Sequence, residues 1–202
     1  MVLLLVLLVA SVVVTVAVAT SFGPVLAVDH VVANGLHGFA LGHPGFVTAA
    51  QVWTDVFQPW TFRAILIFIG LWLLARRRPR TGVWVLATTA LAGILDSGLK
   101  VLIGRDRPHW IDPVSHAVGG SFPSGHSLTS AMACAVLLRL AWPLATRRWA
   151  WSVVAVVLPL ITGFTRMFLG VHYLSDVIGG WLIAAALVLA MMLVDVRHQP
   201  NG

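Results

Sequence analysis

Long apolar runs separated by short polar connections dominate the sequence. Six of these runs have the roughly 17 to 25 residues that an α-helix needs to cross a hydrocarbon core about 30 Å thick. The runs are Val2–Ala19, Pro59–Ala75, Thr81–Leu99, Gly125–Trp142, Trp149–Thr165 and Leu174–Val194. The pattern predicts an all-α fold, a six-helix transmembrane bundle that forms a single membrane-embedded domain over residues 1–202.

The connection Thr20–Gln58 is much longer than the others. It is rich in Gly, Pro and His and is too broken to span a membrane. Within it, apolar residues recur at helical spacing, with His30 and His37 on the opposite face; they are Val28, Val31, Val32, Leu36 and Phe39. We therefore expect an additional interfacial helical segment on the outer face, over residues 20–58. This segment either covers the ends of the spans or acts as a lid or entry ramp for lipid.

Composition identifies a membrane protein and the arrangement of charge gives its orientation. The chain is 59% hydrophobic and 10% charged, with a mean hydropathy of +0.93, which excludes an ordinary soluble domain. The net charge of +6 does not indicate a nucleic-acid partner, because the arginines cluster after the second, fourth and sixth spans: Arg76, Arg77, Arg78, Arg80, Arg147, Arg148 and Arg197. By the positive-inside rule this face and both termini are cytoplasmic, which predicts a multi-pass plasma membrane protein whose partner is the lipid bilayer.

Two features of the spans have simpler interpretations. The first run resembles a signal peptide with a cleavage site near Ala17 and Ala19, but it has no basic n-region and is longer than a typical h-region. Cys134 is the only cysteine, so no disulfide forms within one chain. We expect it to be a small packed residue in the fourth span.

Polar residues gather at the outward ends of spans three to six. Charges in or beside hydrocarbon are costly unless they are paired or wetted, so they are functional candidates. They lie in KVLIGRDRP, in FPSGHS and in TRMFLGVHYLSD, and the topology places them at one depth: Lys100, Arg107, Ser124, Gly125, His126, Arg166, His172 and Asp176. Three cations, two imidazoles and one carboxylate suit a tetrahedral dianion, which predicts a phosphate site facing the extracytoplasmic side.

The spacing of these residues adds chemical detail. Lys100 and Arg107 are two turns apart, so they project the same way if the helix continues past Gly104. Asp176 follows His172 by one turn, where a carboxylate can fix which imidazole nitrogen faces a substrate. The PSGH sequence places free backbone N–H groups at a helix start, and such groups bind phosphate oxygens.

Each candidate also has a structural alternative. Lys100 can snorkel or pair with Asp96, Arg166 can pair with Asp176 as a clasp, and His126 can cap its helix. The polar residues between the third and fourth spans are expected to form a solvated loop: Arg105, Asp106, His109, Asp112 and His116. We expect no metal at His30, His37 and His43, which lack a carboxylate or cysteine at a ligand-like spacing.

Together the motifs carry a family resemblance. K-x6-RP at Lys100 to Pro108, PSGH at Pro123 to His126 and R-x5-H-x3-D at Arg166 to Asp176 resemble the tripartite signature of the type 2 phosphatidic acid phosphatase superfamily. The six-span layout is similar to the bacterial integral-membrane lipid phosphatases of that family. One position departs from the pattern, since Thr165 stands where the family usually has serine.

The resemblance implies a mechanism and a substrate class. It implies that His172 attacks phosphorus and becomes a phosphohistidine, that Asp176 holds its imidazole, and that His126 protonates the leaving oxygen and then activates water. The residues implied to bind phosphate are Lys100, Arg107, Ser124, Gly125 and Arg166. It implies no cofactor and no metal.

The implied substrate is a prenyl diphosphate such as undecaprenyl diphosphate, or else phosphatidylglycerol phosphate, phosphatidate or diacylglycerol pyrophosphate. The competing hypotheses are a phosphate-recognising transporter, a metal hydrolase built on His126, His172 and Asp176, and the family's soluble haloperoxidase branch, which the six spans disfavour. The sequence specifies neither the lipid nor the oligomeric state.

Overall fold

Eight helices make up the part of the chain that the structure describes. The computed structural model of the protein describes residues 1–143 and 145–197, and side chains up to residue 195, so the predicted role of the Arg197 side chain lies outside the described residues. The helices are α1 (Val2–Ala19), α2 (Gly23–Leu41), α3 (Pro44–Val56), α4 (Pro59–Ala75), α5 (Pro79–Ile103), α6 (Gly125–Ala141), α7 (Arg148–Phe168) and α8 (Leu174–Arg197). No strand occurs among these described residues, as the apolar pattern predicted.

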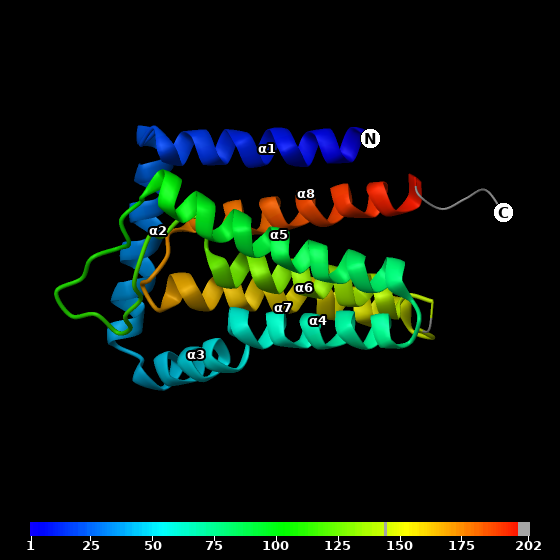
Figure 1. Ribbon diagram of the computed structural model, residues 1–202. Coiled ribbons are helices and arrows are strands. Elements are labelled where there is room, and N and C mark those ends of the chain that lie inside the picture. The colour runs from blue at the N-terminus through cyan, green and yellow to red at the C-terminus, as the bar shows by residue number, and fades with distance from the viewer. Residues whose placement is uncertain (144, 198–202) are drawn as a thin grey trace.

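Six of the helices run side by side, α2 lies across one end of this bundle, and α3 lies beside that end in nearly the same direction as the bundle helices (Figure 1). In Figure 1, α1, α4, α5, α6, α7 and α8 are aligned along one direction, while α2 lies across the end where α5 and α7 finish. The loop from Gly104 to Ser124 lies at this same end. The N-terminus and the α4–α5 connection lie at the opposite end.

The starts and ends of the helices follow from proline and glycine. Proline occupies the first turn of α2, α3, α4 and α5, where its missing N–H removes no helical hydrogen bond. Gly104 ends α5 in the left-handed conformation, with a φ of 59°, and its N–H donates to the Lys100 carbonyl. The expectation that this helix continues past Gly104 is therefore wrong, and Arg107 belongs to the following loop.

The core is built around α6. Leu128, Met132 and Val136 of this helix are fully buried and pack with Leu66 of α4 and Val85 of α5. The first turn of α6 also lies close to α8, because a Cβ at Gly180 would stand 2.9 Å from the Ser124 carbonyl oxygen. Cys134 is buried here, as expected for a packed small residue.

Much of the surface is apolar, as in a multi-pass membrane protein. Among the described residues, five helical segments are long and apolar enough to cross a bilayer: α1, the α3–α4 segment Pro44–Ala75, α5, α7 and Leu174–Asp195 of α8. The predicted span at Gly125–Trp142 corresponds to α6, which is apolar but shorter, with 17 residues.

The segment predicted as one interfacial helix consists of two helices, α2 and α3. Gly42 and His43 separate them, because the following Pro44 fits the first turn of a new helix but not the interior of an existing one. On α2, Asp29 and His37 face the bundle and are buried, whereas the apolar side chain of Val31 is 73% exposed. The buried face of α2 thus combines these two polar side chains with Ala33 and Ala40, while Val31 points away from the bundle.

Candidate functional site

The three sequence motifs meet at the end of the bundle covered by α2. The Ser124 N–H donates to the Asp176 carbonyl at 3.0 Å, which joins the start of α6 to the start of α8. Lys100 Nζ donates to the Pro123 carbonyl at 2.9 Å, and Arg107 Nη1 donates to the Val171 carbonyl at 2.8 Å. Backbone-directed hydrogen bonds therefore bring the motifs together in space, although they are far apart in the chain.

His172 lies between Arg107 and Asp176. Its Nε2 is 3.0 Å from Nη1 of Arg107, and its Nδ1 is 3.4 Å from Oδ2 of Asp176. Because a guanidinium group only donates hydrogen bonds, Nε2 must accept through its lone pair. We therefore assign the neutral tautomer with the proton on Nδ1, on the Asp176 side.

The environment of His172 keeps its imidazole neutral. The side chain is 3% exposed, and burial lowers its pKa to about 4, against the opposing effect of Asp176. The positive charges of Arg107 and Arg166 lower the pKa further. At neutral pH the ring is therefore an uncharged group with its Nε2 lone pair directed at a cation.

Arg107 is held by backbone oxygens and not by a carboxylate. Its guanidinium donates to the carbonyls of Val118, Gly119, Gly120 and Val171 at 2.8–3.2 Å. Burial lowers its pKa, while the more distant Asp176 and Asp96 raise it. Neutral carbonyls leave its charge uncompensated, so this position favours an incoming anion.

Arg166, on the last turn of α7, is more isolated still. Its residue is 7% exposed, and its guanidinium makes no hydrogen bond or ion pair with any described residue; Nε is buried without a partner. Asp55 is the carboxylate that acts on it electrostatically. The predicted clasp with Asp176 is wrong. A buried cation without a partner is costly, and this is the strongest sign that the site is built for an anion.

Lys100 has a carboxylate partner. Its Nζ pairs with Asp96 one turn earlier, as the structural alternative predicted, and Arg63 of α4 donates to the other Asp96 oxygen at 3.2 Å. Gly125 lies against this group, since a Cβ there would stand 2.9 Å from Asp96 Oδ2. Glycine is therefore required for the start of α6 to approach Asp96 so closely.

The first turn of α6 carries the other two candidates. Ser124 is the N-cap residue: its fully buried Oγ accepts from the Ser127 N–H at 3.5 Å and from the Ser127 hydroxyl at 3.1 Å. His126 is therefore not the cap, which corrects its structural alternative. It is half-buried and interacts electrostatically with four of the other candidates: Arg166, His172, Lys100 and Arg107.

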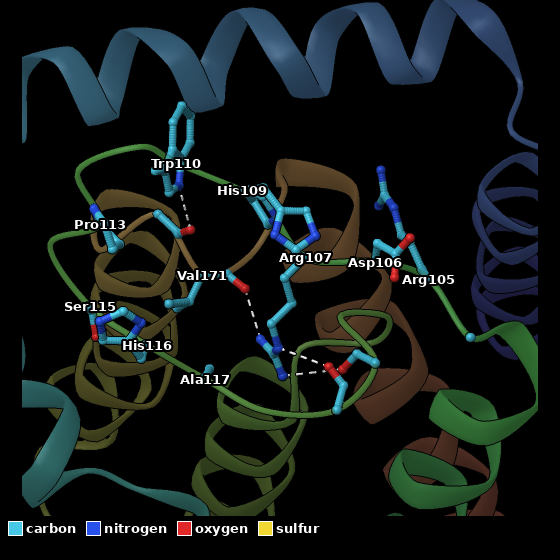
Figure 2. Close-up of a pocket in the computed structure, with 15 residues that line it drawn as sticks. Arg105, Asp106, Arg107, His109, Trp110, Pro113, Ser115, His116, Ala117 and Val171 are labelled. Carbon is cyan, nitrogen blue, oxygen red and sulfur yellow. Dashed lines mark hydrogen bonds between the residues drawn. The ribbon is translucent and has the colours of Figure 1, made fainter.

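A pocket of about 470 Å³ opens beside these groups. It lies beneath the loop from Gly104 to Gly120, and its lining includes Arg107 and Val171, the residue before His172. Figure 2 shows the Arg107 side chain extending between the Val171 carbonyl and the carbonyls of the loop. His172, His126 and Arg166 do not line this pocket, and Arg107 is the candidate site residue that does.

Two charged groups at this site, Arg105 and Asp29, were not predicted from the sequence. Arg105 was expected in a solvated loop, but its side chain is only 9% exposed and pairs with Asp29 and Asp176. The other loop residues are exposed as predicted: Asp106, His109, Asp112 and His116. Asp29 is 1% exposed, and the rule that a lone charge in an apolar segment indicates function applied to it as well.

The histidines of α2 and its following turn do not gather. His30 lies edge-on to Tyr173, His37 stacks on Trp110 at 3.9 Å between ring centres, and His43 stacks on Phe39. In the part of the chain that the structure describes, no three His, Cys, Asp or Glu side chains are grouped to hold a metal ion.

The family model and the relatives that match this chain indicate the same family. The family model described as the PAP2 superfamily matches residues 81–200. The phosphatidylglycerophosphatase B of Bacillus subtilis is 30% identical over 137 residues, which cover 66% of this chain and 67% of that protein. The undecaprenyl-diphosphatase BcrC of the same organism is 31% identical over 129 residues, covering 59% of this chain and 61% of that one.

A third relative and a solved structure extend the likeness. The lipid A 1-phosphatase of Rhizobium etli is 36% identical over 136 residues, covering 60% of this chain and 56% of the relative. The crystal structure of a transmembrane PAP2 type phosphatidylglycerolphosphate phosphatase from Bacillus subtilis has a TM-score of 0.86 and covers 98% of both chains. At 22% identity, this last match concerns the fold.

Proposed function

Because the chain belongs to the PAP2 superfamily of membrane lipid phosphatases, we propose that it removes the terminal phosphate of a lipid phosphate or diphosphate through a phosphohistidine intermediate. One observation carries the mechanism. The Nε2 lone pair of His172 faces Arg107, and Arg166 lies nearby as a buried cation without a partner. A phosphate between these groups would neutralise the cations and present phosphorus to the imidazole.

The reaction proceeds in two balanced steps. In the first, Nε2 of His172 forms a bond to phosphorus, the bond from phosphorus to the lipid oxygen breaks, and His126 donates a proton to that oxygen. In the second, His126 accepts a proton from water as the hydroxide attacks phosphorus, and the P–N bond breaks to release phosphate. Asp176, whose Oδ2 lies 3.4 Å from Nδ1 of His172, stabilises the positive charge that develops on the ring.

The cations act by neutralising charge on the transferring group. Arg107 and Arg166 face the phosphoryl oxygens, and Lys100 exchanges part of its contact with Asp96 for the substrate. Ser124 and the Gly125 N–H contribute donors at the start of α6, where the helix dipole favours an anion. Such catalysis depends on preorganised charge, which exists here before the substrate arrives.

The proposed substrate is a prenyl diphosphate such as undecaprenyl diphosphate. Relatives named undecaprenyl-diphosphatase in Bacillus subtilis and Sulfolobus acidocaldarius support this choice. The second candidate is phosphatidylglycerol phosphate, which the relative named phosphatidylglycerophosphatase B favours. In both lipids the phosphate lies at headgroup depth while the tail stays in the bilayer, which suits a site at the end of a helix bundle.

The proposed orientation places the site outside the cell. The arginines of the α4–α5 connection lie at the end of the bundle opposite α2, which supports a cytoplasmic location for that end (Figure 1). The test uses single cysteines in a Cys134→Ala background, one at Ile111, which is 99% exposed, and one at Arg77. A membrane-impermeant maleimide should label only I111C in intact cells and both variants after lysis, and the reverse pattern would contradict the orientation.

The mechanism is tested with a panel of lipid phosphates in detergent. Phosphate release is measured from undecaprenyl diphosphate, phosphatidylglycerol phosphate and phosphatidate, for the wild type and for His172→Gln, which is close in volume. We expect the variant to lose at least a thousandfold in kcat, as removal of a nucleophile does, and to form no acid-labile phosphoenzyme. Equal activity in the two proteins would remove His172 as the nucleophile.

The same panel separates the competing hypotheses. A phosphate-recognising transporter would bind the lipids without releasing phosphate. A metal hydrolase built on His126, His172 and Asp176 would lose turnover in a chelator and regain it with zinc, whereas the proposed mechanism predicts turnover that the chelator leaves unchanged.

A further inference from the structure

A buried ion-pair chain joins α2 to the candidate nucleophile. Arg105 lies between two carboxylates: its Nη2 is 2.7 Å from Oδ2 of Asp29, and its Nη1 is 2.6 Å from Oδ1 of Asp176. The other Asp176 oxygen lies 3.4 Å from Nδ1 of His172. The order along the chain is therefore Asp29, Arg105, Asp176 and His172.

The charged side chains that form these contacts are buried, so each charge depends on its partners for stabilisation. The side chains of Arg105, Asp29 and Asp176 are 9%, 2% and 0% exposed. Burial by itself disfavours the charged guanidinium, yet Asp176 and Asp29 together raise the pKa of Arg105 above its ordinary value. Arg105 also lies over the ring of Tyr173, 4.3 Å from its centre. Its fork thus has two anionic partners and a fixed orientation.

Asp29 also anchors the start of α8. Its oxygens accept from the Ser175 N–H at 2.8 Å and from the Ser175 hydroxyl at 2.5 Å. Ser175 directly precedes Asp176, so a residue of α2 is bound to the backbone beside the carboxylate that faces His172. Two independent contacts, one through Ser175 and one through Arg105, therefore fix the position of Asp176 relative to α2.

A second contact from α2 reaches the other side of His172. His37 stacks on Trp110, whose indole N–H donates to the Gly170 carbonyl at 2.8 Å. Gly170 has a φ of 67°, and a Cβ there would stand 2.6 Å from the Trp110 nitrogen, so glycine is required at this position. Helix α2 thus contacts the segment carrying His172 both before and after that residue.

We propose that Asp29 and Arg105 are positioning residues, through which the transverse helix α2 sets the geometry and charge of the His172–Asp176 pair. This inference rests on the proposed role of His172. Neither residue is placed to touch the phosphate, because Arg105 uses its fork on Asp29 and Asp176. Their effect is transmitted by the carboxylate of Asp176.

The charges around His172 predict the direction in which each substitution changes its protonation. The groups facing it are Asp176 from α8, Arg107 from the loop, Arg166 from α7 and His126 from α6. Arg105 offsets part of the Asp176 charge, and Asp29 offsets part of the Arg105 charge. Loss of Arg105 should therefore make His172 easier to protonate, and loss of the Asp29 charge should make it harder.

The test measures the protonation of His172 directly. Arg105→Gln and Asp29→Asn are prepared in detergent with 15N-labelled histidine, and the His172 ring nitrogens are identified by their absence in His172→Gln. We expect Arg105→Gln to raise the pKa of His172 by about one unit, a tenfold change in its protonation equilibrium, and Asp29→Asn to shift it the opposite way. Shifts of both variants in the same direction, or no shift, would overturn the proposal.

Activity gives a second measurement on the same variants. With the panel lipid that the wild type hydrolyses fastest, Arg105→Gln should lower kcat about tenfold at the pH of maximal activity and leave KM within twofold. Arg105→Lys should be intermediate, because a single ammonium keeps the charge but cannot bridge two carboxylates with a fixed fork. A rise in KM with unchanged kcat would instead assign Arg105 to substrate binding and contradict the proposal.

A matched pair elsewhere controls for simple loss of stability. Arg139 of α6 pairs with Asp195 of α8 away from the site. Arg139→Gln and Asp195→Asn should leave the His172 titration unchanged. If they shift it as much as the Arg105 and Asp29 variants do, the effect is structural and the proposal fails. The proposed function fails separately, if His172→Gln keeps wild-type activity.

Discussion

The two ends of the helix bundle differ in whether their arginines are exposed or paired with a carboxylate, or are buried without one. At the end opposite α2, Arg76, Arg77 and Arg78 are exposed, and the more enclosed Arg139 has Asp195 as its partner. At the end covered by α2, Arg166 is buried with no partner among the described residues, and Arg107 is bound only to backbone carbonyls and an imidazole.

This difference distinguishes the end with the candidate site better than the number of charges does. Exposed arginines are hydrated and cost little, and they suit the surface of a membrane. A buried cation without a carboxylate costs stability, so its presence calls for a ligand that supplies the missing charge. The same comparison separates Arg105 from Arg107: Arg105, with two carboxylates, serves the structure of the site, and Arg107 is available to an anion.

The largest expected effect comes from removing the unpaired cation. Arg166→Met keeps the length of the side chain and deletes its charge, and we expect kcat/KM to fall by roughly 100- to 1000-fold, as for loss of one preorganised donor. The same variant should be more stable, with a melting midpoint in detergent that rises by roughly 2–4 °C for each kcal/mol gained. Lower activity together with lower stability would contradict a ligand-directed role.

The pH profile should show a smaller, graded effect. In the proposed mechanism His172 reacts through its neutral form, and burial lowers its pKa to about 4. As the pH falls through this value the ring gains a proton and loses its lone pair, so kcat/KM should drop about tenfold per pH unit below about 4. Ionisation of the lipid phosphate also changes kcat/KM with pH. It is therefore measured separately by 31P NMR, and the pH profile is corrected for it. A limb near pH 6.5, the value of an ordinary imidazole, would show that burial does not control His172.

Phosphate mimics should bind at the unpaired cations of the site and thereby stabilise the folded protein. Orthovanadate or inorganic phosphate at about 100 times its Kd should add about 2.7 kcal/mol to the free energy of unfolding and inhibit turnover. The measurement is the thermal midpoint in detergent with and without the anion. The shift should disappear in Arg166→Met, and a shift of the same size in that variant would place the anion elsewhere.

The smallest effects are expected at the other end of the bundle. Arg77→Gln and Arg148→Gln change exposed residues, and we expect kcat/KM to stay within about twofold, because surface charges contribute about 0–1 kcal/mol. Activity on the panel lipid checks this at low and at physiological salt. A loss comparable with that of Arg166→Met would remove the distinction between the two ends.

The sequence located most of the candidate site because its signals are local. Apolar runs identified the helices of the bundle, and short spacings such as that of His172 and Asp176 identified groups one turn apart. The family resemblance is confirmed by the match to the PAP2 superfamily over residues 81–200. Local patterns also gave the pairing of Lys100 with Asp96, because both lie on one face of α5.

The pairings of Arg105 and Arg166 could not be obtained in this way. Arg105 looked like a loop residue, and Arg166 had Asp176 as an obvious partner ten residues later in the chain. Asp29, which lies 76 residues from Arg105, reaches it only because α2 crosses the end of the bundle. The hydrophobic periodicity of neither segment predicts that Asp29 and Arg105 are in contact.

The sequence by itself therefore determined the helical membrane fold, the family and the kinds of residue at the site, since these follow from hydrophobic length and local spacing. Only the tertiary structure decided which cations are compensated and which remain open to an anion. The physical reason is that a buried charge costs free energy whatever its position in the chain, so the sequence already shows which charges need a partner. Which carboxylate, if any, lies about 3 Å away depends on how segments that are far apart in the sequence pack together.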